Sequence, residues 1–287
     1  MKTGILLDSL QLGLYEGLSF AADTGAEGVQ FYASRGELTP WNSSPADWSL
    51  FKQRCADLGL ELAALCGEFG GHGFERANEH KVRIRKTQEL IDFALELGTP
   101  VVSMHIGVVP EDSDSEIYLN LKYALSELSK FAGSRGAILA VETGPEPSDR
   151  LAAFIEDCGT AGLGVNFDPA NLVMVQGSNA AADFARLAPL VAHVHAKDGI
   201  RKKICDARLI YDSFAEDDFA TIDVNDYFDE LPLGSGAVNF PELLEVMNKS
   251  GYTGFLTIER EAGNQRKEDV TEGIRFLKQQ LRELAAK

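Results

Sequence analysis

The chain has 287 residues, of which 45% are hydrophobic and 25% are charged. This composition is typical of a globular protein with one large core. A formal net charge of −17 should repel polyphosphates, so we expect no nucleic-acid partner. No apolar run approaches the ~20 residues of a membrane span, so we expect no membrane partner either. The four cysteines are scattered without a CxxC pair, which favours reduced thiols and a cytoplasmic location.

Short apolar runs alternate with longer helical patterns eight times. Runs such as AILAV and GFLTI are almost continuously apolar, as in strands covered on both faces of a parallel sheet. Eight strand–helix units favour an α/β fold of the closed (β/α)8 type, a TIM barrel in one domain over residues 1–287, rather than an open doubly wound sheet. The predicted strands cover residues 4–10, 28–32, 61–67, 101–107, 137–144, 163–169, 191–199 and 254–261.

The clearest helical patterns cover residues 77–97 and 115–131. Each ends near a glycine, Gly98 or Gly133, which can adopt the left-handed conformation that closes a helix.

Two long segments interrupt this alternation. Residues 33–47 follow the second predicted strand, and residues 200–239 lie between the seventh strand and its helix. The second segment contains the acidic and aromatic run YDSFAEDDFATIDVNDYFDE. Long loops in compact domains are usually functional, and the aromatic residues argue against disorder. We therefore predict a lid or an oligomer contact here, and we expect a homodimer or homotetramer.

Four chemically reactive side chains lie at the ends of four successive predicted strands. They are Glu142, Asp168, His195 and Glu259. In a parallel barrel the carboxyl ends of the strands meet at one mouth. Three clustered carboxylates would repel one another without a cation, and this mixture of oxygen and imidazole donors suits a divalent metal. The sequence therefore predicts one divalent metal ion, Mn²⁺ first, with Mg²⁺, Co²⁺ or Zn²⁺ as alternatives.

Five motifs taken in order resemble the xylose isomerase-like barrels, a family of sugar and sugar-phosphate isomerases and epimerases with endonuclease IV as a DNA-cleaving relative. The motifs are VETG, NFDPAN, HVHAKDG, PLGSGAVNFPELL and GFLTIERE. The resemblance to the ketose 3-epimerase branch implies that the four residues bind the metal and that Glu142 and Glu259 also serve as the catalytic acid/base pair. It also implies that Arg201 contacts the substrate. DNA cleavage is disfavoured by the net charge and by the presence of only five histidines.

Other residues near the predicted mouth are candidates for substrate binding. Lys197 follows the seventh strand, and His105 lies at the end of the fourth. Glu68 and His72 lie in the glycine-rich segment CGEFGGHGF, where the backbone can approach a ligand closely. Asn171 stands where several members of the family carry a histidine. Asparagine can hydrogen-bond to a substrate but cannot shuttle a proton.

The resulting expectation is a metal-dependent isomerase or epimerase of a small sugar, keto-sugar or sugar phosphate. It would act by proton transfer next to a carbonyl, through an enediolate. One alternative is a metal-dependent lyase or dehydratase on a keto-inositol or dehydroshikimate-like substrate, which needs the same base and metal. A second alternative is a non-catalytic sugar-binding barrel.

Overall fold

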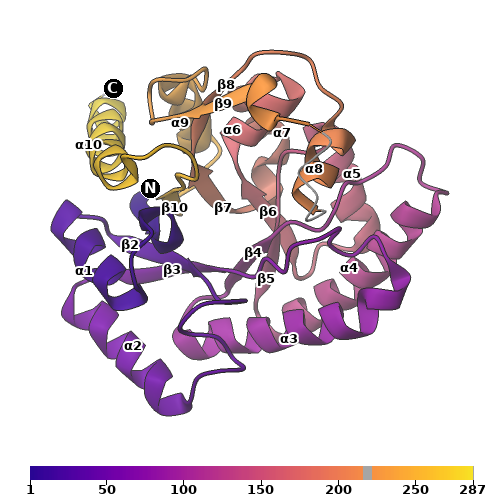
Figure 1. The fold of residues 1–287 in the computed structure, drawn as a ribbon, viewed down its shortest axis with the longest axis horizontal. Coiled ribbons are helices and arrows are strands. Elements are labelled where there is room, and N and C mark those ends of the chain that lie inside the picture. The colour runs from indigo at the N-terminus through magenta and orange to yellow at the C-terminus, as the bar shows by residue number, and fades with distance from the viewer. Residues whose placement is uncertain (216–221, 287) are drawn as a thin grey trace.

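Eight parallel strands close into a barrel in the computed structural model, which describes residues 1–215 and 222–286 (Figure 1). Around the ring the order is β1, β10, β7, β6, β5, β4, β3, β2. The strands are β1 (Lys2–Leu6), β2 (Gly28–Tyr32), β3 (Glu61–Cys66), β4 (Val101–Met104), β5 (Ile138–Glu142), β6 (Leu163–Phe167), β7 (Val191–Ala196) and β10 (Phe255–Ile258). The predicted single-domain (β/α)8 barrel is confirmed.

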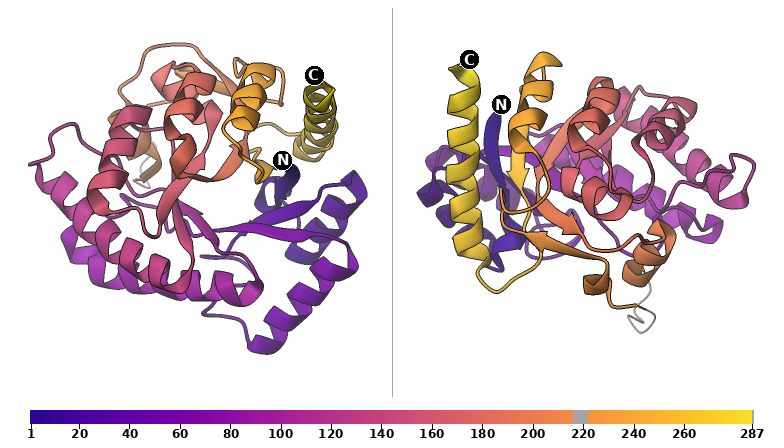
Figure 2. Two further views of the ribbon diagram at one scale, coloured as in Figure 1. Left: turned by 180° about the vertical axis from the view of Figure 1, so that it is seen from behind. Right: turned by 90° about the horizontal axis from the view of Figure 1, so that it is seen from above.

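Helices surround the barrel and cover the outer face of the strands (Figures 1 and 2). They are α1 (Leu14–Thr24), α2 (Pro45–Asp57), α3 (His80–Leu97), α4 (Glu116–Arg135), α5 (Ser148–Cys158), α7 (Ala180–Leu187), α9 (Phe240–Lys249) and α10 (Arg266–Ala285). Strands such as β6 are buried along their whole length, because side chains on one face fill the barrel and those on the other pack against helices. This double burial explains the continuous apolar runs. Among the described residues, no helix combines the length and apolar character that would let it cross a membrane.

Several strands are shorter than predicted. The first was expected over residues 4–10, but β1 ends at Leu6, and Leu7–Leu10 form a 3-10 helix. There the Asp8 carboxylate accepts a hydrogen bond from the backbone N–H of Tyr32 at 2.9 Å. A short apolar run does not separate a strand from a helical turn, and this contact with the neighbouring strand is not visible in the local pattern.

Of the two glycines predicted to end helices, one is confirmed and the other is wrong. Gly98 closes α3 with φ of 102° and is the predicted left-handed cap. Gly133 does not close α4, which continues to Arg135 and is capped by Gly136 with φ of 70°. Gly133 instead lies inside the helix, where a Cβ atom would come within 2.7 Å of the carbonyl oxygen of Ala161. A close approach between two backbones, rather than a helix end, accounts for this glycine.

The segment at 200–239 contains secondary structure that the sequence did not predict. After β7 ends at Ala196, β8 (Asp198–Arg201) pairs antiparallel with β9 (Phe228–Leu231). Between them lie α8 (Ala207–Ala215) and the 3-10 turn Val224–Asp226. The strand predicted over 191–199 is therefore two strands. Residues 216–221, which include Phe219 of the aromatic run, lie outside the described part of the chain.

The Asp198 carboxylate holds the turn at which the chain leaves this segment. It accepts hydrogen bonds from the backbone N–H groups of Gly234, Gly236 and Val238 at 2.9–3.1 Å. A Cβ atom on Gly236 would lie 2.1 Å from Asp198 Oδ1, so only glycine fits. The PLGSG motif is thus the turn that closes around a buried carboxylate.

Candidate metal centre

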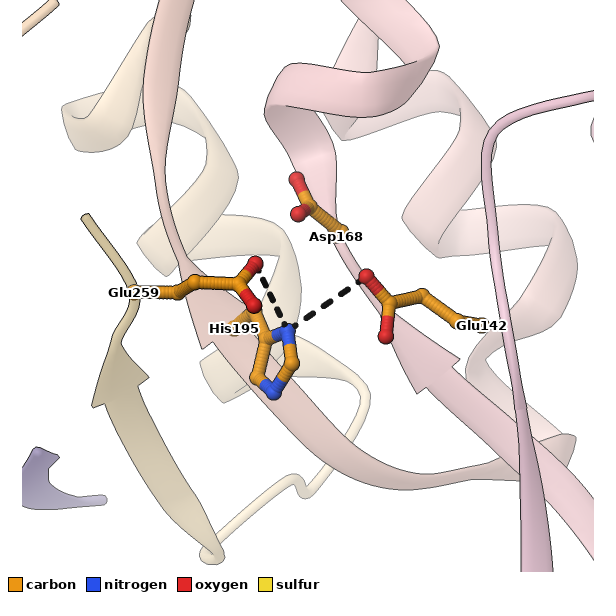
Figure 3. A group of neighbouring side chains, drawn as sticks. All are labelled: Glu142, Asp168, His195 and Glu259. Carbon is orange, nitrogen blue, oxygen red and sulfur yellow. Dashed lines mark ion pairs between the residues drawn. The ribbon is translucent and has the colours of Figure 1, made fainter. Parts of the chain in front are cut away.

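The four predicted ligands meet at the mouth of the barrel. Glu142 ends β5, Asp168 follows β6, His195 lies near the end of β7 and Glu259 follows β10. Each is at most 5% exposed, and one donor atom from each lies within 4.8 Å of all the others. Figure 3 shows the side chains converging on one region from four separate elements. The prediction that the strand ends bring these residues together is confirmed.

His195 is held so that its Nδ1 faces the carboxylates. Nδ1 lies 3.2 Å from Glu259 Oε2 and 3.5 Å from Glu142 Oε1, as the dashed lines in Figure 3 mark. On the other side of the ring, Nε2 lies 3.0 Å from Gln30 Oε1. The Gln30 amide nitrogen donates to Ser103 Oγ at 2.8 Å, which directs the amide oxygen toward His195. A hydrogen bond donated from Nε2 leaves Nδ1 as the nitrogen with a lone pair for a cation.

Asp168 shows why the cluster fits a cation. Its Oδ1 accepts hydrogen bonds from the N–H groups of Ala170 and Asn171, at 2.8 and 3.0 Å. Its Oδ2 is buried and, within the described residues, accepts no hydrogen bond. Burial, reinforced by the charges of Glu259 and Glu142, raises the pKa of Asp168 to about 8, although Lys197 opposes the shift. A buried, unsatisfied oxygen among three carboxylates and an imidazole is a donor set that suits a hard divalent ion.

Lys197 is buried beside the carboxylates. Its Nζ lies 3.1 Å from Glu259 Oε2, 3.9 Å from Asp168 Oδ2 and 3.9 Å from Glu230 Oε2, and it also pairs with Glu261. Burial alone would lower the pKa of Lys197, but the surrounding carboxylates raise it well above its ordinary value. The lysine therefore carries a positive charge next to the predicted metal position.

Besides His195, Glu142 has polar neighbours in Asn166, Asn171 and His105. Its Oε2 accepts a hydrogen bond from Asn166 Nδ2 at 3.0 Å, and its Oε1 accepts one from Asn171 Nδ2 at 3.2 Å. His105 Nε2 lies 3.9 Å from the same Oε1. Asn171 and His105 are thus next to the predicted acid/base residue.

Glu68 and His72 occupy different environments. Glu68 Oε2 accepts hydrogen bonds from the backbone N–H and Nδ1 of His105, at 2.9 and 3.2 Å. His72 Nδ1 lies 3.5 Å from Asp212 on α8. Substrate contact by either residue stays a prediction.

Arg201 lies on β8, and its guanidinium binds backbone rather than the cluster. Its Nη1 donates to the carbonyl oxygen of Gln176 at 3.0 Å, and its Nε donates to that of Lys203 at 3.2 Å. Over residues 1–215 and 222–286, the structure gives it no hydrogen bond or ion pair with the four clustered residues. Its predicted role as a substrate contact stays untested.

Several residues of the site were missed by sequence reasoning. Gln30 had a local signal, because a glutamine in the apolar strand GVQFY is unusual. Glu230 reaches Lys197 from β9, and Tyr211 approaches the mouth from α8 with its ring centroid 5.7 Å from that of His105. Both residues lie on elements of the segment that the sequence predicts to be a long loop.

The fold and cluster define a closed α/β barrel with a carboxylate–histidine centre at the carboxyl ends of its strands. A family model described as "Xylose isomerase-like TIM barrel" matches residues 18–280. The protein therefore belongs to the xylose isomerase-like TIM barrel family.

One curated relative is the uncharacterized protein MJ1311 of Methanocaldococcus jannaschii, which is 27% identical over 215 residues. The match covers 70% of this chain and 63% of that protein, so the chain matches less than two thirds of its relative.

Solved structures share the fold over nearly the full length of the chain. A xylose isomerase domain protein from Planctomyces limnophilus is 26% identical, with a TM-score of 0.79 and coverage of 99% of this chain and 97% of that one. A D-tagatose 3-epimerase-like protein is 22% identical, with a TM-score of 0.76 and coverage of 100% and 99%. The probable 3-DHS dehydratase AsbF from Bacillus anthracis is 15% identical, with a TM-score of 0.73 and coverage of 97% and 99%.

Proposed function

We propose that the protein is a divalent-metal-dependent isomerase or epimerase of a small sugar, keto-sugar or sugar phosphate. Its family and the structural similarity to a D-tagatose 3-epimerase-like protein support this class of enzyme. The donor set at the mouth supports a metal requirement, with Mn²⁺ as the first ion to test.

The placement of Glu142 and Glu259 carries the proposal. Glu142 ends β5 and Glu259 follows β10. These two strands are separated in the ring by β6 and β7, so the two carboxylates approach from well-separated sides of the mouth. Both point toward Nδ1 of His195. Two carboxylates that flank one substrate position can remove a proton from one face of a carbon and return one to the other face, or move it to a neighbouring carbon.

Each side chain of the site has a proposed role. Asp168 and His195 would hold the cation together with the two glutamates, and the glutamates would also accept and return the substrate proton. When bound, a divalent cation supplies Lewis-acid stabilisation of the negative charge that develops on the substrate oxygens. Lys197, which is buried and charged, orients a substrate oxygen at the same place. His105, Asn171 and Arg201 are further proposed substrate contacts, as is His72.

The direct test is a panel of ketoses, ketose phosphates and inososes incubated with the Mn²⁺-loaded protein in D₂O. Incorporation of deuterium without loss of water supports the isomerase or epimerase. Loss of water would instead indicate a dehydratase, the activity that the name of the similar AsbF protein states. Metal analysis of the purified protein distinguishes both from a non-catalytic sugar-binding barrel.

Variants of the two glutamates, compared with a surface control, test whether the activity resides at this site. Glu142→Gln and Glu259→Gln should each abolish deuterium incorporation, because an amide cannot accept the proton. Glu127→Gln, an exposed site on α4, provides the control. Unchanged turnover and metal content in both site variants would show that the centre lies elsewhere.

A cytoplasmic location and a homodimer or homotetramer are also proposed. The free state of all four cysteines is compatible with a reducing compartment. Fractionation of cells and light scattering of the purified protein test the two proposals separately.

A further inference from the structure

We propose that Glu68 is a positioning residue that fixes the imidazole of His105, and that His105 forms a hydrogen bond through Nε2 with a sugar oxygen beside Glu142. This inference rests on the proposed function, because it gives Glu68 and His105 specific roles at the same site.

The Glu68 carboxylate binds the segment around His105 at two points. Its Oε2 accepts hydrogen bonds from the backbone N–H of His105 at 2.9 Å and from Nδ1 at 3.2 Å. The backbone bond fixes the carboxylate relative to the end of β4, and the ring bond then fixes the imidazole relative to the carboxylate. Glu68 is itself held by the N–H of Gly70, which donates to Oε1 at 3.0 Å. A residue with both oxygens occupied in this way is suited to orient its neighbour.

The orientation directs the opposite ring nitrogen at the reaction site. His105 Nε2 lies 3.9 Å from Glu142 Oε1, which is too long for a direct hydrogen bond. In the part of the chain that the structure describes, no other group forms a hydrogen bond with Nε2. The His105 side chain is 34% exposed, whereas that of Glu142 is 5% exposed, so the imidazole stands on the open side of the carboxylate. A substrate oxygen entering the mouth meets Nε2 and Glu142 together.

In this arrangement a carboxylate, Glu68, orients the imidazole of His105, which in turn faces the substrate position. A carboxylate bound to one nitrogen of an imidazole sets which nitrogen faces the substrate and limits rotation of the ring. Tyr211 restricts the ring from another side, with the two ring centroids 5.7 Å apart. Glu68 therefore acts through His105 rather than by touching the sugar.

A double-mutant cycle tests whether Glu68 acts through His105 or by direct contact with the sugar. Turnover is measured with the ketose of the panel that the Mn²⁺-loaded wild-type protein converts fastest. His105→Gln should lower kcat about 100-fold. Glu68→Ala should lower kcat about 10-fold, with a smaller change in KM, and Glu68→Gln should recover part of the loss because its carbonyl oxygen still accepts from Nδ1. In the His105→Gln background, Glu68→Ala should cause no further loss.

Additive losses in the cycle would overturn the positioning role, since they would mean that Glu68 acts on the substrate independently of His105. Glu61→Ala is the matched control. Glu61 is the same residue type at the opposite end of β3, where it pairs with Lys2 at the surface. Metal content and circular dichroism of each variant must match the wild type, so that loss of the fold is not counted as loss of positioning.

A second measurement does not depend on turnover. In ¹⁵N-histidine spectra of the metal-free protein, the ring that disappears in His105→Gln should show a protonated Nδ1. Glu68→Ala should shift that ring alone, and Glu61→Ala should shift none. An unchanged ring in Glu68→Ala would refute the orientation. If the wild type converts no member of the panel, the proposed function and the substrate contact fail, while the spectra still decide whether Glu68 fixes His105.

Discussion

The amide oxygen of Gln30 lies 3.0 Å from Nε2 of His195, although 165 positions separate the two residues in the chain. The same oxygen lies 3.1 Å from Nε2 of His193. Gln30 thus joins β2 to β7 across the interior of the barrel. Burial, together with the charge of His195, lowers the pKa of His193 well below its ordinary value. His193 is therefore neutral and belongs to the packed interior beneath the site.

Replacing Gln30 should weaken metal binding without removing a ligand. Gln30→Met keeps the volume but removes the acceptor that orients His195, so affinity for Mn²⁺ should fall about 10- to 100-fold. Calorimetric titration of the metal-free protein measures the change. The control is Gln53→Met on the exposed face of α2. Equal affinity in both variants would show that His195 needs no support from Gln30.

Metal removal should destabilise the protein, and Asp168 should account for part of the effect. An ion that binds only the folded state adds about 2.7 kcal/mol at 100 times its Kd. Asp168→Asn should abolish most of this gain. Without metal, this variant should unfold at the same or a higher temperature than wild type, because it removes a buried carboxylate close to two others. Thermal unfolding with Mn²⁺ and with a chelator checks both parts. Asp92→Asn, on the surface, should leave the metal effect intact.

Gly144 should not tolerate a side chain while Tyr211 is in place. A Cβ atom there would lie 2.1 Å from the Tyr211 hydroxyl oxygen and 2.8 Å from Asn171 Cβ. Gly144→Ala should therefore cost about 1–3 kcal/mol of unfolding free energy from overpacking, in addition to backbone strain, and should disturb the mouth. Tyr211→Phe should recover part of the loss, and urea unfolding of the single and double variants measures it.

Gly36→Ala supplies the control for backbone strain. Gly36 has φ of +85°, and a Cβ atom there would meet nothing within 4 Å. If Gly36→Ala cost as much as Gly144→Ala, crowding by Tyr211 would not be the cause.

Glu146 should make stability fall as the pH rises. Burial raises its pKa from 4.5 to about 8, although the Val109 N–H opposes the shift. Between these values the folded protein binds more protons than the unfolded chain, so the free energy of unfolding decreases with increasing pH. The stability that Glu146 contributes is fully present below about pH 4.5 and is lost by about pH 8.

Glu146→Gln removes this dependence. Relative to wild type it should gain a few kcal/mol of unfolding free energy from pH 5 to pH 8, with ~5 kcal/mol as an upper limit. Urea unfolding in the presence of a chelator measures the difference at each pH. Glu111→Gln, whose side chain is 91% exposed, should show no such trend. A constant difference between wild type and Glu146→Gln would contradict the raised pKa.

The barrel and the clustering of Glu142, Asp168, His195 and Glu259 are predictable from the sequence alone. Burial on both faces makes a parallel strand apolar along its length, so β5 and β6 were recognisable locally. Parallel strands then bring their carboxyl ends to one mouth, which predicts that Glu142 and Asp168 lie together.

The side chains that surround these four residues are not predictable from the local sequence, because they depend on how separate elements pack. Gln30 meets His195 because the barrel closes, and Glu230 meets Lys197 because β9 folds back on β8. Glu68 binds His105 because the loop after β3 lies against the end of β4. Periodicity reports which face of one element is buried, but it contains no information on how separate elements are aligned. The partners of the site depend on that alignment.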